Sequence, residues 1–227
     1  MPLEALQKRP RKASKEVRRR QLIDAAIATI AECGLSGATT ARVTEAAGLS
    51  LGIVSLHFES KDNLLTESLR FLATELREAW RGGATDANHD AAERLSAIID
   101  ALFAPEVCTP DKVAVWFAFF GEAKHRVAYR KILDHFDRER VDAIEAQCAA
   151  LKAAGGYDAV DATALATQVE SLTDGLWLSM LLYPDWMTPE RAKAQVYDLL
   201  AVHFPDHFDR APTGTADDCA KDQSLRA

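Results

Sequence analysis

The chain lacks the features that mark membrane, secreted and disulfide-stapled proteins. None of its apolar runs approaches the roughly 18 consecutive residues that a membrane-spanning helix needs. The N-terminal segment has neither an apolar run nor a small-residue cleavage site, so we do not expect a secretory signal. The cysteines are too widely spaced for a Cys-x-x-Cys metal site and are typical of reduced thiols. They are Cys33, Cys108, Cys148 and Cys219. We therefore expect a cytoplasmic protein without a membrane partner.

A net positive charge is also missing, which taken alone argues against a nucleic-acid-binding protein. The 27 lysines and arginines are outnumbered by 34 aspartates and glutamates, and the net charge is −7. The charges are unevenly distributed, because residues 1–20 carry +6, residues 1–70 carry +3 and the remainder carries −10. A basic head on an acidic body is the asymmetry expected when one end of a protein meets a polyanion.

Alternation of apolar and polar residues is absent over any five positions, and so are runs of β-branched residues, which leaves no candidate for a β-strand. Apolar residues instead recur at helical spacing, as at Ile23, Ile27 and Ile30. We predict an all-α protein of about nine helices. The first ends at Gly34, and the others cover 40–47, 50–57, a helix capped by Ser60, 95–103, 111–124, a long helix ending at Gly155-Gly156, 158–182 and 189–203.

Two short predicted helices joined by Ala47-Gly48-Leu49-Ser50 have the shape of a helix-turn-helix. Gly48 would supply the sharp turn, and Ser50 would cap the second helix, which would enter the major groove. Only Ser55 and His57 offer hydrogen-bonding side chains to bases there, so phosphate contacts should carry much of the affinity. The residues expected to anchor the second helix are Ile53, Val54 and Phe58. The residues expected to contact DNA are Arg18, Arg19, Thr40, Ser50, Leu51, Gly52, Ser55, Leu56, His57 and Lys61.

From Arg19 to Leu65, above all in TTARVTEAAGLSLGIVSLHFESKDNLL, the sequence resembles the DNA-binding domain of the TetR family of bacterial repressors. That family has two threonines, an Ala-Gly turn, a Ser, a Gly early in the next helix, a closing Phe, then Lys and Leu-Leu. The chain departs from the pattern at Ser55, where most members have a phosphate-contacting Tyr. BetI-type, choline-responsive repressors of glycine betaine synthesis have Ser there. RRRQLIDAAIATI, VWFAFFGEAKHRVAYRKI and TDGLWLSMLL resemble the same branch.

The resemblance implies a repressor, not an enzyme, that binds a pseudo-palindromic DNA operator as a homodimer and encloses a small-molecule effector in a C-terminal domain. We accordingly divide the chain into a flexible basic arm (1–14), a helix-turn-helix domain (15–60), a ligand-binding and dimerisation domain (61–205) and a disordered tail (206–227). The helices at 158–182 and 189–203 would form the four-helix bundle of the dimer. The apolar residues expected in its core and interface are Leu176, Leu178, Met180, Leu181, Val196, Leu199 and Leu200.

Aromatic rings and carboxylates in the C-terminal half suit a quaternary ammonium, which has no N–H to donate and is held by cation–π and Coulomb attraction. The predicted effector-binding residues are Trp116, Phe119, Phe120, Glu122, Tyr129, Asp174 and Trp177. Asp174 interrupts an apolar helix, where a buried carboxylate without a partner is costly. Choline would fit this cavity, and betaine aldehyde or another cation would fit about as well.

Several alternatives compete with this interpretation. Aromatic residues at helical spacing are more often core residues than ligand cages, and Asp174 could pair with Lys124 or Arg126 instead of a ligand. A TetR-type regulator of a different effector would have the same DNA-binding domain. A small helical enzyme or scaffold is disfavoured because no paired catalytic groups stand out.

Two further motifs are set aside, and we expect no metal and no cofactor. Residues 48–52 match the Gly-x-Ser-x-Gly nucleophile motif, but that motif works only on a strand-to-helix turn. His203 and His207 have the spacing of a metal pair, but Pro205 would break the helix between them.

Overall fold

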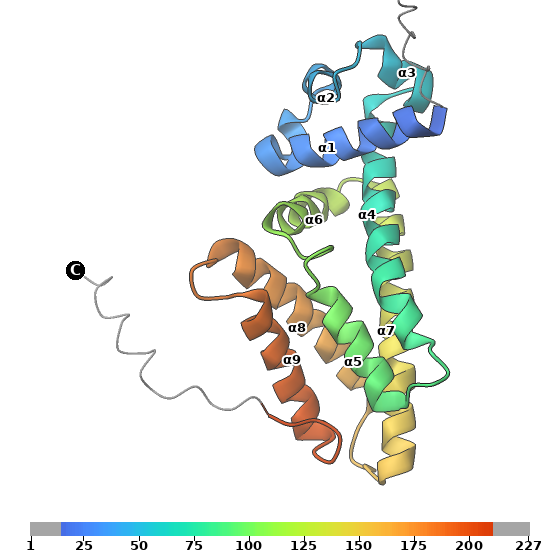
Figure 1. Ribbon diagram of the computed structural model, residues 1–227, viewed down its shortest axis with the longest axis vertical. Coiled ribbons are helices and arrows are strands. Elements are labelled where there is room, and N and C mark those ends of the chain that lie inside the picture. The colour runs from blue at the N-terminus through green and yellow to red at the C-terminus, as the bar shows by residue number, and fades with distance from the viewer. Residues whose placement is uncertain (1–14, 211–227) are drawn as a thin grey trace, which may run out of the picture. The chain divides into compact units, whose positions relative to one another are not determined.

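The computed structural model describes residues 15–210, and within that range every regular element is a helix (Figure 1). The prediction of an all-α protein is thereby confirmed. The predicted basic arm, with the DNA contacts expected of it, and residues 211–227 of the predicted tail lie outside the described range. The helices are α1 (Lys15–Gly37), α2 (Thr40–Ala46), α3 (Gly52–Phe58), α4 (Lys61–Ala84), α5 (Ala91–Leu102), α6 (Pro110–Ala123), α7 (Val127–Gly155), α8 (Ala162–Leu182) and α9 (Pro189–His203).

The described residues fall into two compact units. The first unit comprises residues 15–72 and 114–132, and the second comprises 73–113 and 133–210. Helices α4, α6 and α7 each contribute residues to both units. The predicted boundary at residue 60 does not coincide with the boundary between the two compact units. As a division between the DNA-binding and the effector-binding parts of the chain, it remains a prediction. None of the helices in the described range is long and apolar enough to cross a membrane.

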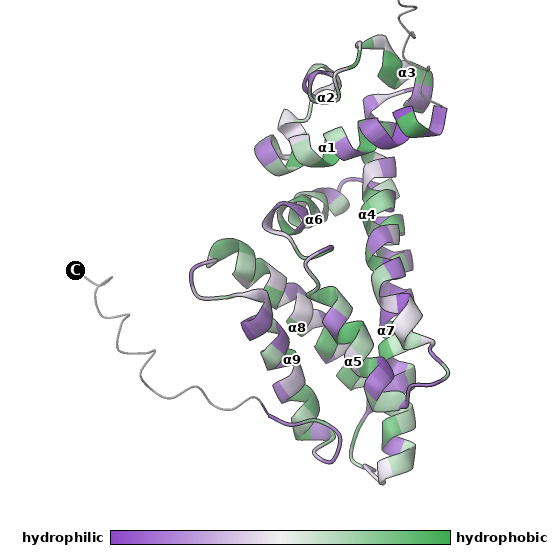
Figure 2. Ribbon diagram, in the orientation of Figure 1, coloured by the Kyte–Doolittle hydropathy of each residue, from purple (hydrophilic) through white to green (hydrophobic). Residues whose placement is uncertain are grey.

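Helices α1, α2 and α3 form the head, a three-helix body within the first unit. Its core is built on Leu22, Ala26, Val43, Val54 and Phe58, all of which are buried. Figure 2 shows hydrophilic and hydrophobic residues interleaved along α1 and α4, as amphipathic helices require. The predicted anchors Val54 and Phe58 lie in this core, and Ile53 packs against it half-buried.

The helix boundaries follow from local capping in most places. Ser60 caps α4 as predicted, because its Oγ accepts a hydrogen bond from the backbone N–H of Asn63 at 3.1 Å. Ser50 was expected to cap α3 in the same way, and that prediction is wrong. Leu51 is the N-cap of α3, it already has helical φ and ψ, and no side chain caps this end. The backbone carbonyl of Ser50 instead accepts from the N–H of Ile53 at 3.0 Å.

The second unit contains α5, α8 and α9 together with parts of α4, α6 and α7. Helices α8 and α9 pack against each other, and α5 also contacts α9. The N-cap Thr188 and the first-turn Pro189 begin α9 at the predicted residue, and the helix ends at His203 as expected. In this pair, Leu176, Val196 and Leu200 are buried core residues, whereas Leu178 is 39% exposed.

Two glycines of the helix-turn-helix have opposite backbone requirements. Gly48 has φ +63°, a left-handed conformation that side chains with a Cβ rarely adopt, and open space surrounds the position of an added Cβ. We therefore expect Gly48→Ala to lower the free energy of unfolding by about 1 kcal/mol through backbone strain alone. Gly52 lies in α3 with ordinary φ and equally open surroundings, so Gly52→Ala should be neutral or stabilising by up to about 1 kcal/mol.

Urea unfolding of both variants measures these changes. Equal effects at the two positions would contradict the turn geometry, because the space around both glycines is the same.

Candidate DNA interface and effector site

Helix α3 turns one face into the head and leaves the other exposed, as a recognition helix must. Leu56 is 72% exposed and Leu51, just before the helix, is 63% exposed, although both are apolar. Gly52 and Ser55 are also exposed, whereas His57 is half-buried. Exposed apolar side chains beside a serine suit contact with thymine methyl groups in a major groove.

The other predicted DNA contacts surround this helix in the chain. Ser50 is exposed in the turn, and Thr40 is half-buried at the first position of α2. Lys61 is half-buried at the first position of α4. All three belong to the first unit, and their contacts with DNA remain a prediction.

The side chains of Arg18 and Arg19 are engaged inside the first unit. Arg19 donates a hydrogen bond to the backbone carbonyl of His57 in the last turn of α3. Arg18 donates to Oε1 of Gln21 at 2.8 Å, and Nε2 of the same amide donates to the carbonyl of Ala47 at 2.6 Å. Sequence reasoning missed Gln21, because its partner is 26 residues away and nothing in the local pattern marks the contact.

Four of the aromatic residues predicted to hold an effector form two ring pairs in the first unit, which together are called the aromatic cluster. The rings of Trp116 and Phe120 lie 6.0 Å apart between centroids, and those of Phe119 and Tyr129 meet edge to face at 5.0 Å. Trp116, Phe119 and Tyr129 are buried, and Phe120 is half-buried. These residues come from α6 and the start of α7, so the structure brings four of the predicted rings into one compact body.

Tyr129 is the most unusual member of this cluster. It is 1% exposed, and its hydroxyl finds no hydrogen-bond partner among the described residues. Burial raises the pKa of Tyr129, an effect that the nearby Arg126 guanidinium partly opposes. Leaving a buried hydroxyl unpaired costs about 1–3 kcal/mol, so a polar ligand atom or a water that paired with it would be stabilised there. The ring also has the Arg126 guanidinium 5.4 Å from its centroid.

Glu122 lies at the edge of this region rather than among the rings. Its carboxylate is 3.6 Å from the guanidinium of Arg126, which also pairs with Asp62 at 3.2 Å. Arg126 therefore links the turn between α6 and α7 to the first turn of α4 within the first unit.

The remaining predicted effector residues, Asp174 and Trp177, belong to the second unit. Trp177 is 4% exposed, and its indole N–H donates to the carbonyl of Leu102 at 3.2 Å. Asp174 lies off the apolar stripe of α8 and is exposed in the single chain, although its carboxyl still loses part of its water beside neighbouring side chains. The expectation of a fully buried carboxylate is therefore wrong. The seven predicted residues divide between the units, and their joint role in one site remains a prediction.

Asp174 nevertheless belongs to an acidic cluster around a buried arginine. Arg140 donates from Nε to Glu170 at 2.9 Å and from Nη2 to Asp137 at 3.0 Å. Partial loss of water around its carboxyl, followed by repulsion from Glu170, raises the pKa of Asp174 to about 7, and attraction to Arg140 opposes this. The cation that acts on Asp174 is thus Arg140. The alternative partner Arg126 pairs with Asp62 and Glu122.

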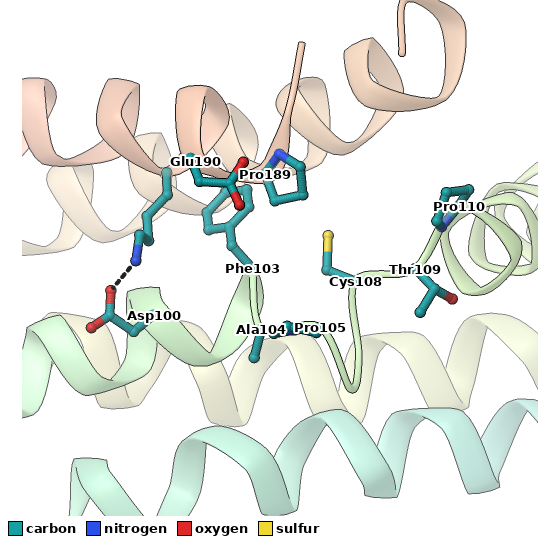
Figure 3. A pocket seen from close by; sticks show the side chains of 10 residues that line it. Asp100, Phe103, Ala104, Pro105, Cys108, Thr109, Pro110, Pro189 and Glu190 are labelled. Carbon is teal, nitrogen blue, oxygen red and sulfur yellow. Dashed lines mark ion pairs between the residues drawn. The ribbon is translucent and has the colours of Figure 1, made fainter. Parts of the chain in front are cut away.

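The second unit also contains pockets that the sequence did not predict, and two of them adjoin each other at Cys108. A cavity of about 490 Å³ lies between the end of α5 and the start of α9 (Figure 3). Lys193 and Asp100 form an ion pair at its edge, 3.2 Å apart. A smaller apolar cavity of about 150 Å³ shares Cys108 with it. Burial raises the pKa of the Cys108 thiol to about 12, which keeps it protonated. No predicted effector residue lines either cavity.

The raised pKa of Asp174 gives a pH-dependent prediction. Between the unfolded value near 3.8 and the folded value of about 7, the unfolded chain has released this proton and the folded chain has not. The folded state therefore loses stability as pH rises through that window. We expect Asp174→Asn to unfold at a higher urea concentration than the wild type at pH 8, with the advantage shrinking towards pH 4.

The matched control is Asp185→Asn, which removes an exposed loop carboxylate outside this cluster. If the midpoint urea concentrations of Asp174→Asn and the wild type differ by the same amount at every pH, the raised pKa of Asp174 is not the cause of the difference.

Comparison with known proteins agrees with the head and the C-terminal helices. Residues 22–67 match the family described as bacterial regulatory proteins of the tetR family, and residues 91–205 match the BetI-type transcriptional repressor C-terminal family. An HTH-type transcriptional regulator BetI from Paraburkholderia xenovorans is 34% identical over 74% of this chain and 84% of its own length. BetI 1 from Chromohalobacter salexigens is 30% identical over 90% of this chain and 98% of its own.

Solved structures show the same fold. A transcriptional regulator from Pseudomonas aeruginosa PAO1 has a TM-score of 0.75 at 28% identity, covering 84% of this chain and 92% of its own. A regulator from Saccharomonospora viridis, solved in complex with choline, has a TM-score of 0.70 at 23% identity, covering 82% of this chain and 96% of its own. TetR-family regulators are not enzymes, and they bind DNA operators and small-molecule effectors, usually as dimers. The chain belongs to the TetR family of transcriptional repressors and carries a BetI-type C-terminal domain.

Proposed function

We propose that the protein is a homodimeric repressor that binds a pseudo-palindromic operator and is released by choline, and that it thereby controls genes of glycine betaine synthesis. The observation that carries the effector assignment is the buried, unpaired hydroxyl of Tyr129, whose ring meets that of Phe119 edge to face. The choline complex of the Saccharomonospora viridis regulator supports the same ligand class for this fold.

The chemistry of the cluster suits choline at both of its ends. The trimethylammonium group can lie against the faces of Trp116 and Phe120, each such contact adding about 0.5–2 kcal/mol once water is removed. Tyr129 is neutral at physiological pH, as an ordinary tyrosine is, and burial raises its pKa further, so its hydroxyl can both donate to and accept from the hydroxyl of choline. Glu122 completes the proposed site within the first unit, where its carboxylate supplies long-range attraction for a cation. Asp174 and Trp177 are proposed to contribute to effector binding from the second unit.

The second candidate is a TetR-type repressor of a different small molecule, such as another quaternary ammonium or an apolar ligand. The observation that favours an apolar ligand is the small cavity of the second unit, whose lining includes Val113, Met180 and Leu181. Such a ligand would be held by apolar burial and would make no use of the Tyr129 hydroxyl.

The dimer would form through α8 and α9, where Leu178, Leu182 and Val202 are 39%, 57% and 57% exposed in the single chain. Two heads that read successive major grooves need recognition helices about 34–36 Å apart. Choline releases the operator only if it binds more tightly to a dimer with a different spacing of the heads. The part of α4 from Lys61 to Trp80 is the proposed lever between the effector and the head.

Titration calorimetry tests the effector. Choline should release heat, whereas its uncharged isostere 3,3-dimethyl-1-butanol should release little, because only the cation gains cation–π attraction. Tyr129→Phe should weaken choline binding about fivefold to tenfold through the lost hydrogen bond. Tyr183→Phe, which alters a tyrosine exposed in the loop between α8 and α9, is the matched control and should bind as the wild type does. Equal heats for choline and the isostere would eliminate the cation cage.

A mobility-shift assay tests repression separately. The protein should retard the DNA upstream of its own gene, more strongly at low salt, and choline should release that DNA. Tyr129→Phe should retain the shift and need correspondingly more choline for release. A salt-sensitive shift that choline leaves unchanged would support the repressor and reject choline as its effector.

A further inference from the structure

Helix α1 reaches the far ends of both short helices of the head through two side chains. Gln21 donates from Nε2 to the carbonyl of Ala47, the C-cap of α2, at 2.6 Å. Arg19 donates to the carbonyl of His57 in the last turn of α3. Both contacts join residues far apart in the chain, at separations of 26 and 38 positions.

The carbonyls at these two ends need partners from elsewhere. The last four carbonyls of an α-helix have no partner within it, and the same end carries the negative pole of the helix dipole. A guanidinium at the end of α3 satisfies both needs, because it is always charged and only donates. Helix α3 ends at Glu59, which has a positive φ of 67° and whose backbone N–H donates to the carbonyl of Ser55, so the carbonyl of His57 is left for Arg19.

Arg19 is held on three sides. Its guanidinium carbon lies 4.3 Å from the centroid of the Phe58 ring, and Nη2 lies 3.8 Å from the Glu67 carboxylate of α4. Only 26% of its side chain remains exposed. Gln21 is oriented as well, because Arg18 donates to its amide oxygen at 2.8 Å and so leaves the amide N–H groups to face Ala47.

We propose that Arg19 and Gln21 are positioning residues for operator recognition, which set the angle of α3 against α1 rather than binding phosphate. The proposal rests on the proposed operator binding and replaces the expected phosphate contact of Arg19. Few side chains on α3 can hydrogen-bond to bases, so a small rotation of the helix removes a large share of its sequence reading. The guanidinium of Arg19 already contacts the carbonyl of His57, the ring of Phe58 and the carboxylate of Glu67, so it is poorly placed to bind a phosphate.

The two roles predict different salt dependence. Removing a phosphate contact weakens binding to every sequence alike and lowers the slope of log affinity against log salt by about 0.9. Removing a positioning contact leaves this slope unchanged. It lowers the ratio of the affinity for operator DNA to the affinity for scrambled DNA.

The experiment measures fluorescence anisotropy with two duplexes across a salt series. One duplex covers the segment that wild-type protein protects upstream of its own gene, and the other has the same composition in scrambled order. Arg19→Gln removes the charge at the end of α3, and Gln21→Met keeps the length of the side chain but removes the donor. Arg20→Gln is the control, because Arg20 is an adjacent exposed arginine that pairs with Asp24 at 2.7 Å and lies 4.0 Å from the Phe71 ring.

We expect Arg19→Gln and Gln21→Met each to lower the operator-to-scrambled ratio about tenfold with an unchanged salt slope. Arg20→Gln should keep the ratio, and Arg19→Lys should restore part of it because a cation remains beside the carbonyl of His57. Choline heats should be unchanged in all four variants. Thermal unfolding is recorded for each variant, and if Arg19→Gln fails to fold, Gln21→Met decides the result.

The proposal is overturned if Arg19→Gln lowers the salt slope by about one and weakens both duplexes equally, which identifies a phosphate contact. It is also overturned if both variants match Arg20→Gln. A wild-type protein that does not distinguish the duplexes rejects operator binding itself, and that failure is visible before any variant is compared.

Discussion

Neither short helix of the head can hold its shape alone. Helices α2 and α3 have seven residues each, whereas isolated helices need about 12–15 residues to be even marginally stable in water. Their structure therefore depends on the apolar surface of α1, where Leu22 and Ala26 are wholly buried against Val43 and Val54. The exposed face of α3 exists because this packing fixes which face is covered. The position of the head's DNA-binding surface is in this sense a property of α1.

The aromatic residues proposed to bind the effector belong to the same compact unit as the DNA-binding helices, since residues 114–132 group with the head. Arg126 adjoins Tyr129 and also pairs with Asp62, which follows α3 in the chain by four residues. An exposed ion pair of this kind contributes less than about 1 kcal/mol. Any signal from ligand to DNA must therefore travel mainly through buried packing, and Leu64, Leu65 and Leu69 of α4 are buried in this unit.

Most of the fold could be predicted because helix boundaries are encoded locally. Ser60 caps α4 with its own side chain and Pro189 begins α9, and both predictions are confirmed. Ser50 failed because Leu51 takes up helical geometry without a side-chain cap. The contact between Gln21 and Ala47 had no local signature at all, since its partners meet only in the folded head.

The candidate sites were less predictable than the helices. Spacing alone grouped Asp174 with Trp177. The apolar stripe of α8 includes Trp177, which is buried, but not Asp174, which is exposed. A helical wheel drawn through Leu165, Val169 and Leu176 would have shown this. The aromatic cluster was predictable for the same reason, because Trp116, Phe119 and Phe120 lie on one such stripe of α6.

The length of α3 limits how much sequence one head can read. Seven residues at a rise of about 1.5 Å give a helix roughly 10 Å long, which spans about three base pairs at 3.4 Å each. A three-base-pair word recurs by chance roughly once in every 64 positions, far too often to mark one gene in a genome. Requiring two such words at a fixed separation reduces chance matches to roughly one in 4,096 positions, so in a TetR-type dimer the distance between the heads decides which pairs of words count as an operator.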